Sequence, residues 1–113
     1  MKTIVMATPS GMKSVDFLDE DVVFVNDAFA LILTPWGEVD VHHRPSGYKT
    51  GVFRYEAQAR RGIEIMMASG IDWMEQDAVK IAARAELVEV RRKLDELISE
   101  RFHIPECEYR KCR

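Results

Sequence analysis

The stretch DWMEQDAVKIAARAELVEVRRKLDELISERF, residues 72–102, decides which class of fold this chain adopts. It contains no Pro and no Gly, and residues that favour helix dominate it. Asp72, followed three residues later by Glu75, is typical of a capping box at a helix start, and Pro105 lies just past the expected end. The stretch therefore predicts one long helix.

Two rows of apolar side chains run along this predicted helix. At about 100° per residue the rows lie almost opposite each other and overlap in the middle of the helix. A helix of about 30 residues spans roughly 45 Å, whereas a compact domain of 113 residues has a radius of gyration of about 13 Å. One row can pack on the rest of the chain, so the other predicts contact with a second molecule. The first row is Met74, Ala78, Ile81, Ala85 and Val88, and the second is Ala83, Leu87, Val90, Leu94 and Leu97.

Charged side chains occupy the remaining surface of the second half of this helix. Opposite charges four residues apart predict ion pairs along a solvated side. The apolar side chains across from them are poorly tolerated in water unless another molecule covers them. The expected pairs are Arg91 with Asp95, Arg92 with Glu96, and Glu89 with Lys93.

Upstream of the helix, short apolar runs separated by turn residues predict a sheet. The turns Asn26-Asp27 and Thr34-Pro35-Trp36-Gly37 have the residue types that connect antiparallel neighbours. The unbroken apolar run at residues 28–33 is typical of a strand covered on both faces. The expected strands are residues 3–7, 22–25, 28–33 and 38–42.

A Gly-rich loop at residues 44–51 separates this sheet from a second predicted helix over residues 53–69. The apolar side of that helix is expected to contain Tyr55, Ala59, Ile63 and Met66. Strands that precede helices favour an α+β fold. We therefore expect an N-terminal antiparallel β-meander of three to four strands, packed against a C-terminal helical pair with one long helix.

Composition limits the classes of protein to consider. The formal net charge of −3 provides no overall attraction for nucleic acid, so that partner is not expected. The longest apolar run, residues 28–33, is far shorter than the roughly 20 residues that a membrane helix needs. Both cysteines fall in the last seven residues, which favours a reducing cytoplasmic location. We expect one domain over residues 1–104 and a tail over residues 105–113.

No catalytic motif is present, and we expect neither an enzyme nor a cofactor. His42 and His43 are adjacent on a strand, so their side chains point to opposite faces and suit one metal site badly. They are expected to lie at a solvent-facing strand end. His103, Cys107 and Cys112 form an incomplete set for structural zinc, which commonly uses two close Cys pairs.

The sequence instead predicts a small protein–protein interaction or accessory protein that forms a homodimer through the long helix. Such chains resemble inhibitors from viruses or mobile elements, which is an analogy of size and composition only. Trp36, a large aromatic residue at a turn, is the candidate anchor for a partner protein. Expected partner-binding residues are Trp36, Leu87, Val90, Leu94, Leu97 and Ile98, with a secondary surface of Arg44, Tyr48, Lys49 and Arg54.

Two alternatives from other classes remain open. A nucleic-acid-binding regulator would use the basic residues of 44–61 and the C-terminal tail, and its binding would weaken with salt. A small enzyme or ligand-binding protein would have its site near His42, His43 and Lys49.

Overall fold

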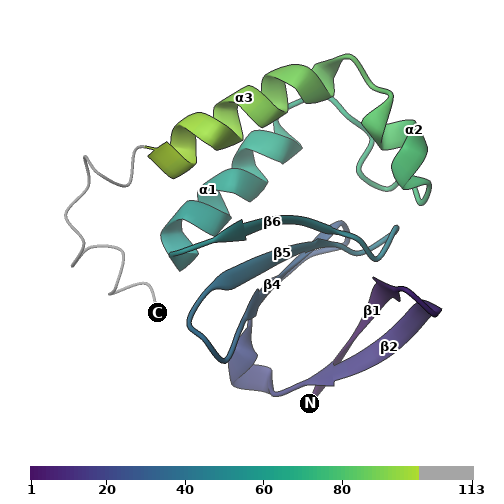
Figure 1. Ribbon diagram of the computed structural model, residues 1–113, viewed down its shortest axis with the longest axis vertical. Coiled ribbons are helices and arrows are strands. Elements are labelled where there is room, and N and C mark those ends of the chain that lie inside the picture. The colour runs from purple at the N-terminus through teal and green to yellow at the C-terminus, as the bar shows by residue number, and fades with distance from the viewer. Residues whose placement is uncertain (100–113) are drawn as a thin grey trace.

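A computed structural model describes residues 1–99 and confirms the α+β fold, with strands first and helices after them. Figure 1 shows three layers, with α1 and α3 on one side of a four-stranded sheet and the β1–β2 ribbon on the other. The predicted tail, residues 105–113, lies outside the described residues. The strands are β1 (Lys2–Thr8), β2 (Gly11–Phe17), β3 (Val22–Val25), β4 (Phe29–Leu33), β5 (Val39–His43) and β6 (Lys49–Phe53), and the helices are α1 (Glu56–Met67), α2 (Ala78–Ala82) and α3 (Glu86–Ser99).

The sheet is an antiparallel meander in the order β3-β4-β5-β6. The predicted turn at residues 26–27 is confirmed, because Asn26 Oδ1 accepts hydrogen bonds from the backbone N–H groups of Ala28 and Phe29. The turn between β4 and β5 also forms as predicted, with Gly37 N–H donating to the Thr34 carbonyl at 3.0 Å. Both turns hold consecutive strands in register.

Strand β4 is covered on both faces, as its continuous apolar sequence predicts. Phe29 and Leu31 belong to the main core between the sheet and the helices, and both are fully buried. Ala30 and Ile32 point the other way, into a second cluster that Ile4 of β1 completes. The β1–β2 ribbon therefore acts as the cover for the far face of the sheet.

Two strands were not predicted. In β2, most side chains are exposed, so the strand lacks the alternation of buried and exposed residues that identifies strands in a sequence. Strand β6 occupies the end of the predicted loop, and its register shifts between Val41 and His42 of the neighbouring β5. Because β6 continues to Phe53, α1 begins at Glu56 rather than at residue 53.

The apolar face of α1 is confirmed, with Tyr55, just before its first turn, and Ala59, Ile63 and Met66 all buried. Gly62 lies on the same side, where a Cβ atom would come within 2.9 Å of Phe53 Cζ. It would also lie 3.4 Å from a methyl group of Leu94. Glycine has a low helix propensity, but at this position it allows α1 to approach β6 and α3 closely.

The prediction of one uninterrupted helix from Asp72 is wrong. Asp72 Oδ1 accepts a hydrogen bond from Met74 N–H in a turn, and the helical segment begins only after Asp77. Asp77 is the actual N-cap of α2, with its carboxylate accepting from Val79 N–H at 2.9 Å. The helix then ends at Ala82, and α3 begins at Glu86.

The break between α2 and α3 explains how both opposite apolar rows can contribute to the core of one molecule. On a straight helix the rows would face different directions, but separate helices can turn both rows toward one core. Ile81 from the first row and Val90 and Leu97 from the second are buried in the same cluster as Trp73. The Cα radius of gyration is 14.1 Å, close to the roughly 13 Å of a compact domain of this length.

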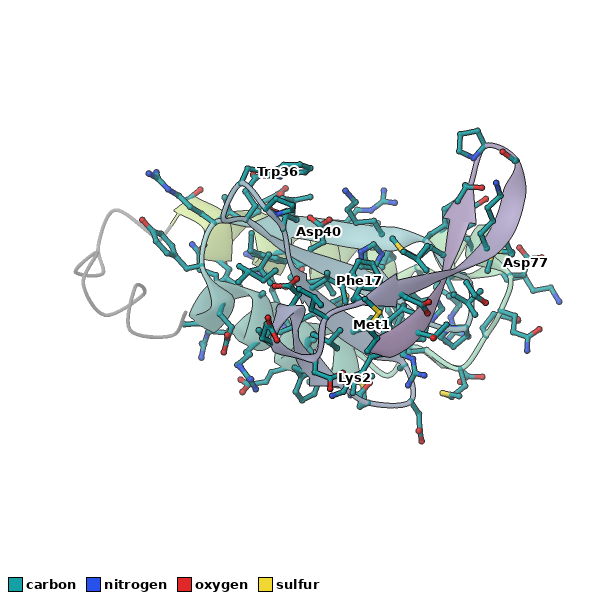
Figure 2. All side chains as sticks on the ribbon, turned by 90° about the horizontal axis from the view of Figure 1, so that it is seen from below. Met1, Lys2, Phe17, Trp36, Asp40 and Asp77 are labelled. Atoms are coloured by element: carbon teal, nitrogen blue, oxygen red, sulfur yellow. The ribbon has the colours of Figure 1, made fainter. Side chains whose placement is uncertain are left out.

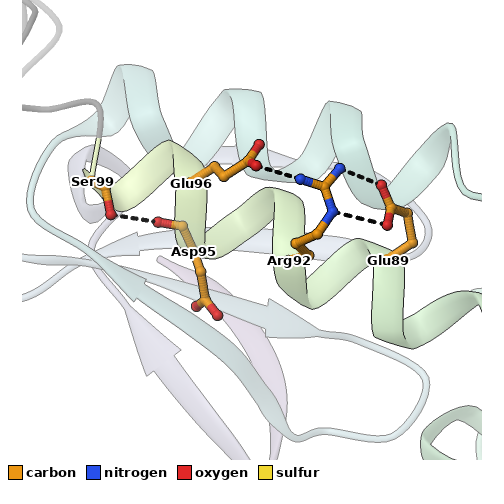
Figure 3. A network of polar contacts seen from close by, with 5 residues as sticks. All are labelled: Glu89, Arg92, Asp95, Glu96 and Ser99. Carbon is orange, nitrogen blue, oxygen red and sulfur yellow. Dashed lines mark hydrogen bonds and ion pairs between the residues drawn. The ribbon is translucent and has the colours of Figure 1, made fainter.

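The outer side of α3 is charged, as the sequence predicts. Figure 3 shows Arg92 between two carboxylates, with its guanidinium donating to Glu89 one turn before it and to Glu96 one turn after it. The Arg92–Glu96 pair was expected, whereas the structure contains no ion pair between Arg91 and Asp95 within residues 1–99. Among residues 1–99 the Arg91 guanidinium has no carboxylate partner.

Candidate partner-binding surface

Three residues that the sequence analysis selected meet at one place. Trp36 from the β4–β5 turn, Arg54 just after β6 and Ile98 from the last turn of α3 line a single cavity of about 430 Å³. Val52 of β6 lies beside them. The exposed fractions of Trp36, Val52 and Ile98 are 73%, 41% and 37%, so the cavity has an apolar, accessible rim.

The turn holds Trp36 in place from both sides. Pro35 fixes the backbone at the second turn position, and Gly37 adopts a φ of 87°, which suits glycine. Thr34 Oγ1 accepts from Glu38 N–H and donates to the Glu38 carbonyl, both at 3.1 Å. Figure 2 shows Trp36 at the margin of the molecule. The indole is exposed on a short, hydrogen-bonded support.

The floor of the cavity is partly polar. Phe53 and Gln58 are buried there, and the Gln58 amide donates to the carbonyl of Leu97 at 3.4 Å. The rim carries opposite charges, Arg54 and Glu38, neither of which has an ion-pair partner within residues 1–99. The Arg54 guanidinium lies 5.7 Å from the centre of the Tyr55 ring. The surface thus combines three exposed apolar side chains with two charges that have no ion-pair partner among residues 1–99.

The two edges of the sheet differ in how they are protected. At the β3 edge, Arg60 of α1 donates to the Val23 carbonyl at 2.9 Å, is paired with Glu56, and lies over the ring of Phe24. At the opposite edge, β6 pairs with β5 only, and no described residue bonds to its outward backbone groups. An open edge of this kind is a template for a further strand.

The residues predicted to form the dimer contact on α3 are mostly packed into the chain's own core. They are called the α3 seam here and comprise Leu87, Val90, Leu94, Leu97 and Ile98. Val90 and Leu97 are each 3% exposed and belong to the main core, while Leu87 and Leu94 pack against it. The helix break directs these side chains toward the sheet and α1. Of the five seam residues named above, Ile98 is the one with substantial exposure, and it lies in the Trp36 cavity.

The predicted secondary surface is divided among separate places. Arg44 donates to the Asn26 carbonyl at 2.6 Å, and the Lys49 ammonium lies 3.4 Å from Asp40 Oδ2. Tyr48 borders a different cavity from the one beside Arg54. The four residues therefore do not form one patch within residues 1–99, and the nucleic-acid alternative, which also uses the C-terminal tail, stays a prediction.

His42 and His43 point to opposite faces as predicted, but both are buried rather than solvent-facing. His43 Nε2 donates to the Trp73 carbonyl at 2.5 Å, and its Nδ1 accepts from the Ser46 hydroxyl at 2.7 Å. Burial lowers the pKa of His43, and the bond to Trp73 opposes that shift in part. Sequence reasoning missed this pairing because Trp73 is 30 residues away.

His42 lies on the ribbon-covered face, in register with Ala30. Burial lowers its pKa, while Asp40 raises it and Lys49 lowers it further. Its Nδ1 has no hydrogen-bond partner among residues 1–99. Within the same range no three His, Cys, Asp or Glu side chains converge to hold a metal ion. His103, Cys107 and Cys112 lie outside the described residues.

The chain matches no family model, no curated protein and no solved structure in the three comparisons. Among the helices of residues 1–99, none combines the length and apolar content that crossing a membrane requires. The geometry of the Trp36 cavity and of the β6 edge is therefore the basis on which a function is proposed.

Proposed function

We propose that this chain is a non-enzymatic protein-binding module that takes an extended segment of a partner protein along β6. One apolar side chain of that segment enters the cavity beside Trp36. The observation that supports the proposal is the proximity of an open sheet edge to a tryptophan that is 73% exposed. Strand addition supplies affinity through main-chain hydrogen bonds, and the adjoining pocket supplies specificity.

The size of the cavity suits one large anchor. An engineered cavity of about 150 Å³ holds benzene in another protein, so about 430 Å³ accepts an aromatic or long aliphatic side chain. The two rim charges add direction. Arg54 favours an acidic residue on one side of the anchor and Glu38 a basic one on the other, which fixes the orientation of the segment more than its affinity.

A separate protein suits this surface better than a second copy of the chain. Val90 and Leu97, two of the residues on which the predicted self-association depends, are buried in the chain's own core. The remaining exposed apolar side chains at the Trp36 surface are few, and they lie at a single cavity. Such a surface is typical of a small anchor site rather than of the larger apolar interface of an obligate dimer.

The experiment is a selection of extended peptides from a random displayed library on the full chain. Each enriched peptide is then measured against the wild type, Trp36→Ala and the control Val79→Ala. Val79 is 75% exposed on α2, which Figure 1 places at the other end of the sheet from the β4–β5 turn. Loss of a central interface tryptophan weakens binding by roughly thirtyfold or more, whereas the control leaves binding unchanged.

Three results would overturn the proposal. The first is a set of enriched peptides that bind Trp36→Ala as tightly as the wild type, and the second is no enrichment at all. The third is sedimentation showing that the wild type dimerises and that Trp36→Ala removes the dimer, since the occupant of the surface would then be a second copy.

A further inference from the structure

A second cavity, of about 220 Å³, lies between the sheet and the helices at the break between α2 and α3. Its apolar walls come from α1, α2, α3 and the residue Trp73 that precedes α2. They are Met66, Trp73, Ile81, Leu87, Val90 and Leu94. The cavity exists because the helix breaks and its two halves turn around the same core. It is separate from the Trp36 cavity and does not depend on the proposed function.

Three polar side chains that line this cavity, Ser46, Lys49 and Thr50, already have partners. Ser46 donates to His43 and accepts from Tyr48 N–H, and Thr50 Oγ1 donates to the Val41 carbonyl. Lys49 contributes to the lining, but its ammonium is paired with Asp40. These groups therefore have little hydrogen-bonding capacity left for a ligand.

Arg91 differs from all of them. It is exposed, it lines the cavity from α3, and its guanidinium has no carboxylate partner among residues 1–99. Its neighbour Arg92 takes both nearby glutamates, Glu89 and Glu96. A planar guanidinium with unused N–H donors at the mouth of an apolar pocket matches a carboxylate attached to an apolar body.

We propose that this cavity binds a small amphipathic carboxylic acid, with its apolar part among Trp73, Ile81 and Leu94 and its carboxylate on Arg91. The volume sets the size class. A cavity of about 150 Å³ in another protein binds benzene, so about 220 Å³ holds a single ring with a carboxylate at the mouth. Benzoate is the simplest molecule of this class and is the probe for the test.

The test is a titration of the isotopically labelled full chain with benzoate, followed by backbone amide shifts. The amides of His43, Ser46, Leu87 and Val90 are expected to shift together along one binding curve. Benzyl alcohol, which has the same ring without the charge, is expected to bind about tenfold more weakly because it lacks the charge-assisted hydrogen bonds.

Two variants and one matched control separate the contributions of charge and cavity. Arg91→Gln is expected to remove the preference for benzoate over benzyl alcohol, while Lys93→Gln removes the same charge from another side of α3 and leaves that preference intact. Ala78→Leu fills the cavity and is expected to abolish the binding of both molecules. A preference that survives Arg91→Gln, shifts scattered over the surface cations, or no shift up to the solubility limit would each overturn the proposal.

Discussion

Two valines on α3 provide a matched test of how this helix is used. Val90 is 3% exposed in the main core, whereas Val88, two residues earlier on the same helix, is 75% exposed. Val→Ala at either site gains the same helix propensity, about 0.5 kcal/mol. At Val90 it also removes two buried carbon groups, worth about 1.6 kcal/mol, and leaves a cavity that adds about 1 kcal/mol.

The expected difference in unfolding free energy between the two variants is therefore about 2–3 kcal/mol. Val90→Ala should be less stable than the wild type, and Val88→Ala should be equal to it or slightly more stable. Urea unfolding followed by circular dichroism measures both, at several protein concentrations. Equal unfolding free energies for the two variants would refute the placement of α3. A urea midpoint that rises with protein concentration would instead support a dimer.

Three further predictions concern the interior. Gly62→Ala gains about 1 kcal/mol of helix propensity but places a Cβ 2.9 Å from Phe53 Cζ. Urea unfolding should therefore show a net loss of stability, and a stabilised variant would contradict that contact. Ser46→Ala leaves His43 Nδ1 without its donor and should cost about 1–3 kcal/mol by the same assay, against no change if the bond is absent. Folding lowers the pKa of His42 and His43, so on acidification the unfolded chain takes up protons before the folded chain does. The unfolding free energy should therefore fall as the pH drops below about 6.5. A urea midpoint that stays constant down to about pH 5 would exclude this linkage.

The parts of the fold that the sequence predicted depend on local signals. Asn26 and Gly37 identify their turns because their conformations are set within four residues. The buried face of α1 follows from helical spacing alone. Strand β2 was missed because none of its side chains is buried and only Val15 and Phe17 are half-buried, so its sequence lacks the alternation that identifies a strand.

The break in the long helix could not be read from propensity, because residues 72–102 contain no Pro or Gly. The two opposite apolar rows were the relevant signal, but a straight helix with a partner and a broken helix without one explain those rows equally well. The core decides between them, since Ile81 and Val90 can both be buried in one molecule only if the chain turns. Residues far apart in sequence determine that outcome.

The candidate site was predictable only in part, because it too depends on residues far apart in the sequence. Trp36 was identified from its chemistry and its position in a turn, and Ile98 from its apolar character near the end of the helix. Their meeting around one cavity with Arg54 depends on how α3 packs across α1, which no local pattern records. The open β6 edge was not predicted because the strand itself was interpreted as a loop.

The most direct measurement is an NMR structure of the full chain bound to a peptide from the selection. A binding surface at Trp36 predicts main-chain contacts between the peptide and residues 49–53, slowed amide exchange along β6, and one apolar peptide side chain against the Trp36 indole. Peptide contacts confined to α2 or α3, with the exchange of β6 amides unchanged, would contradict it.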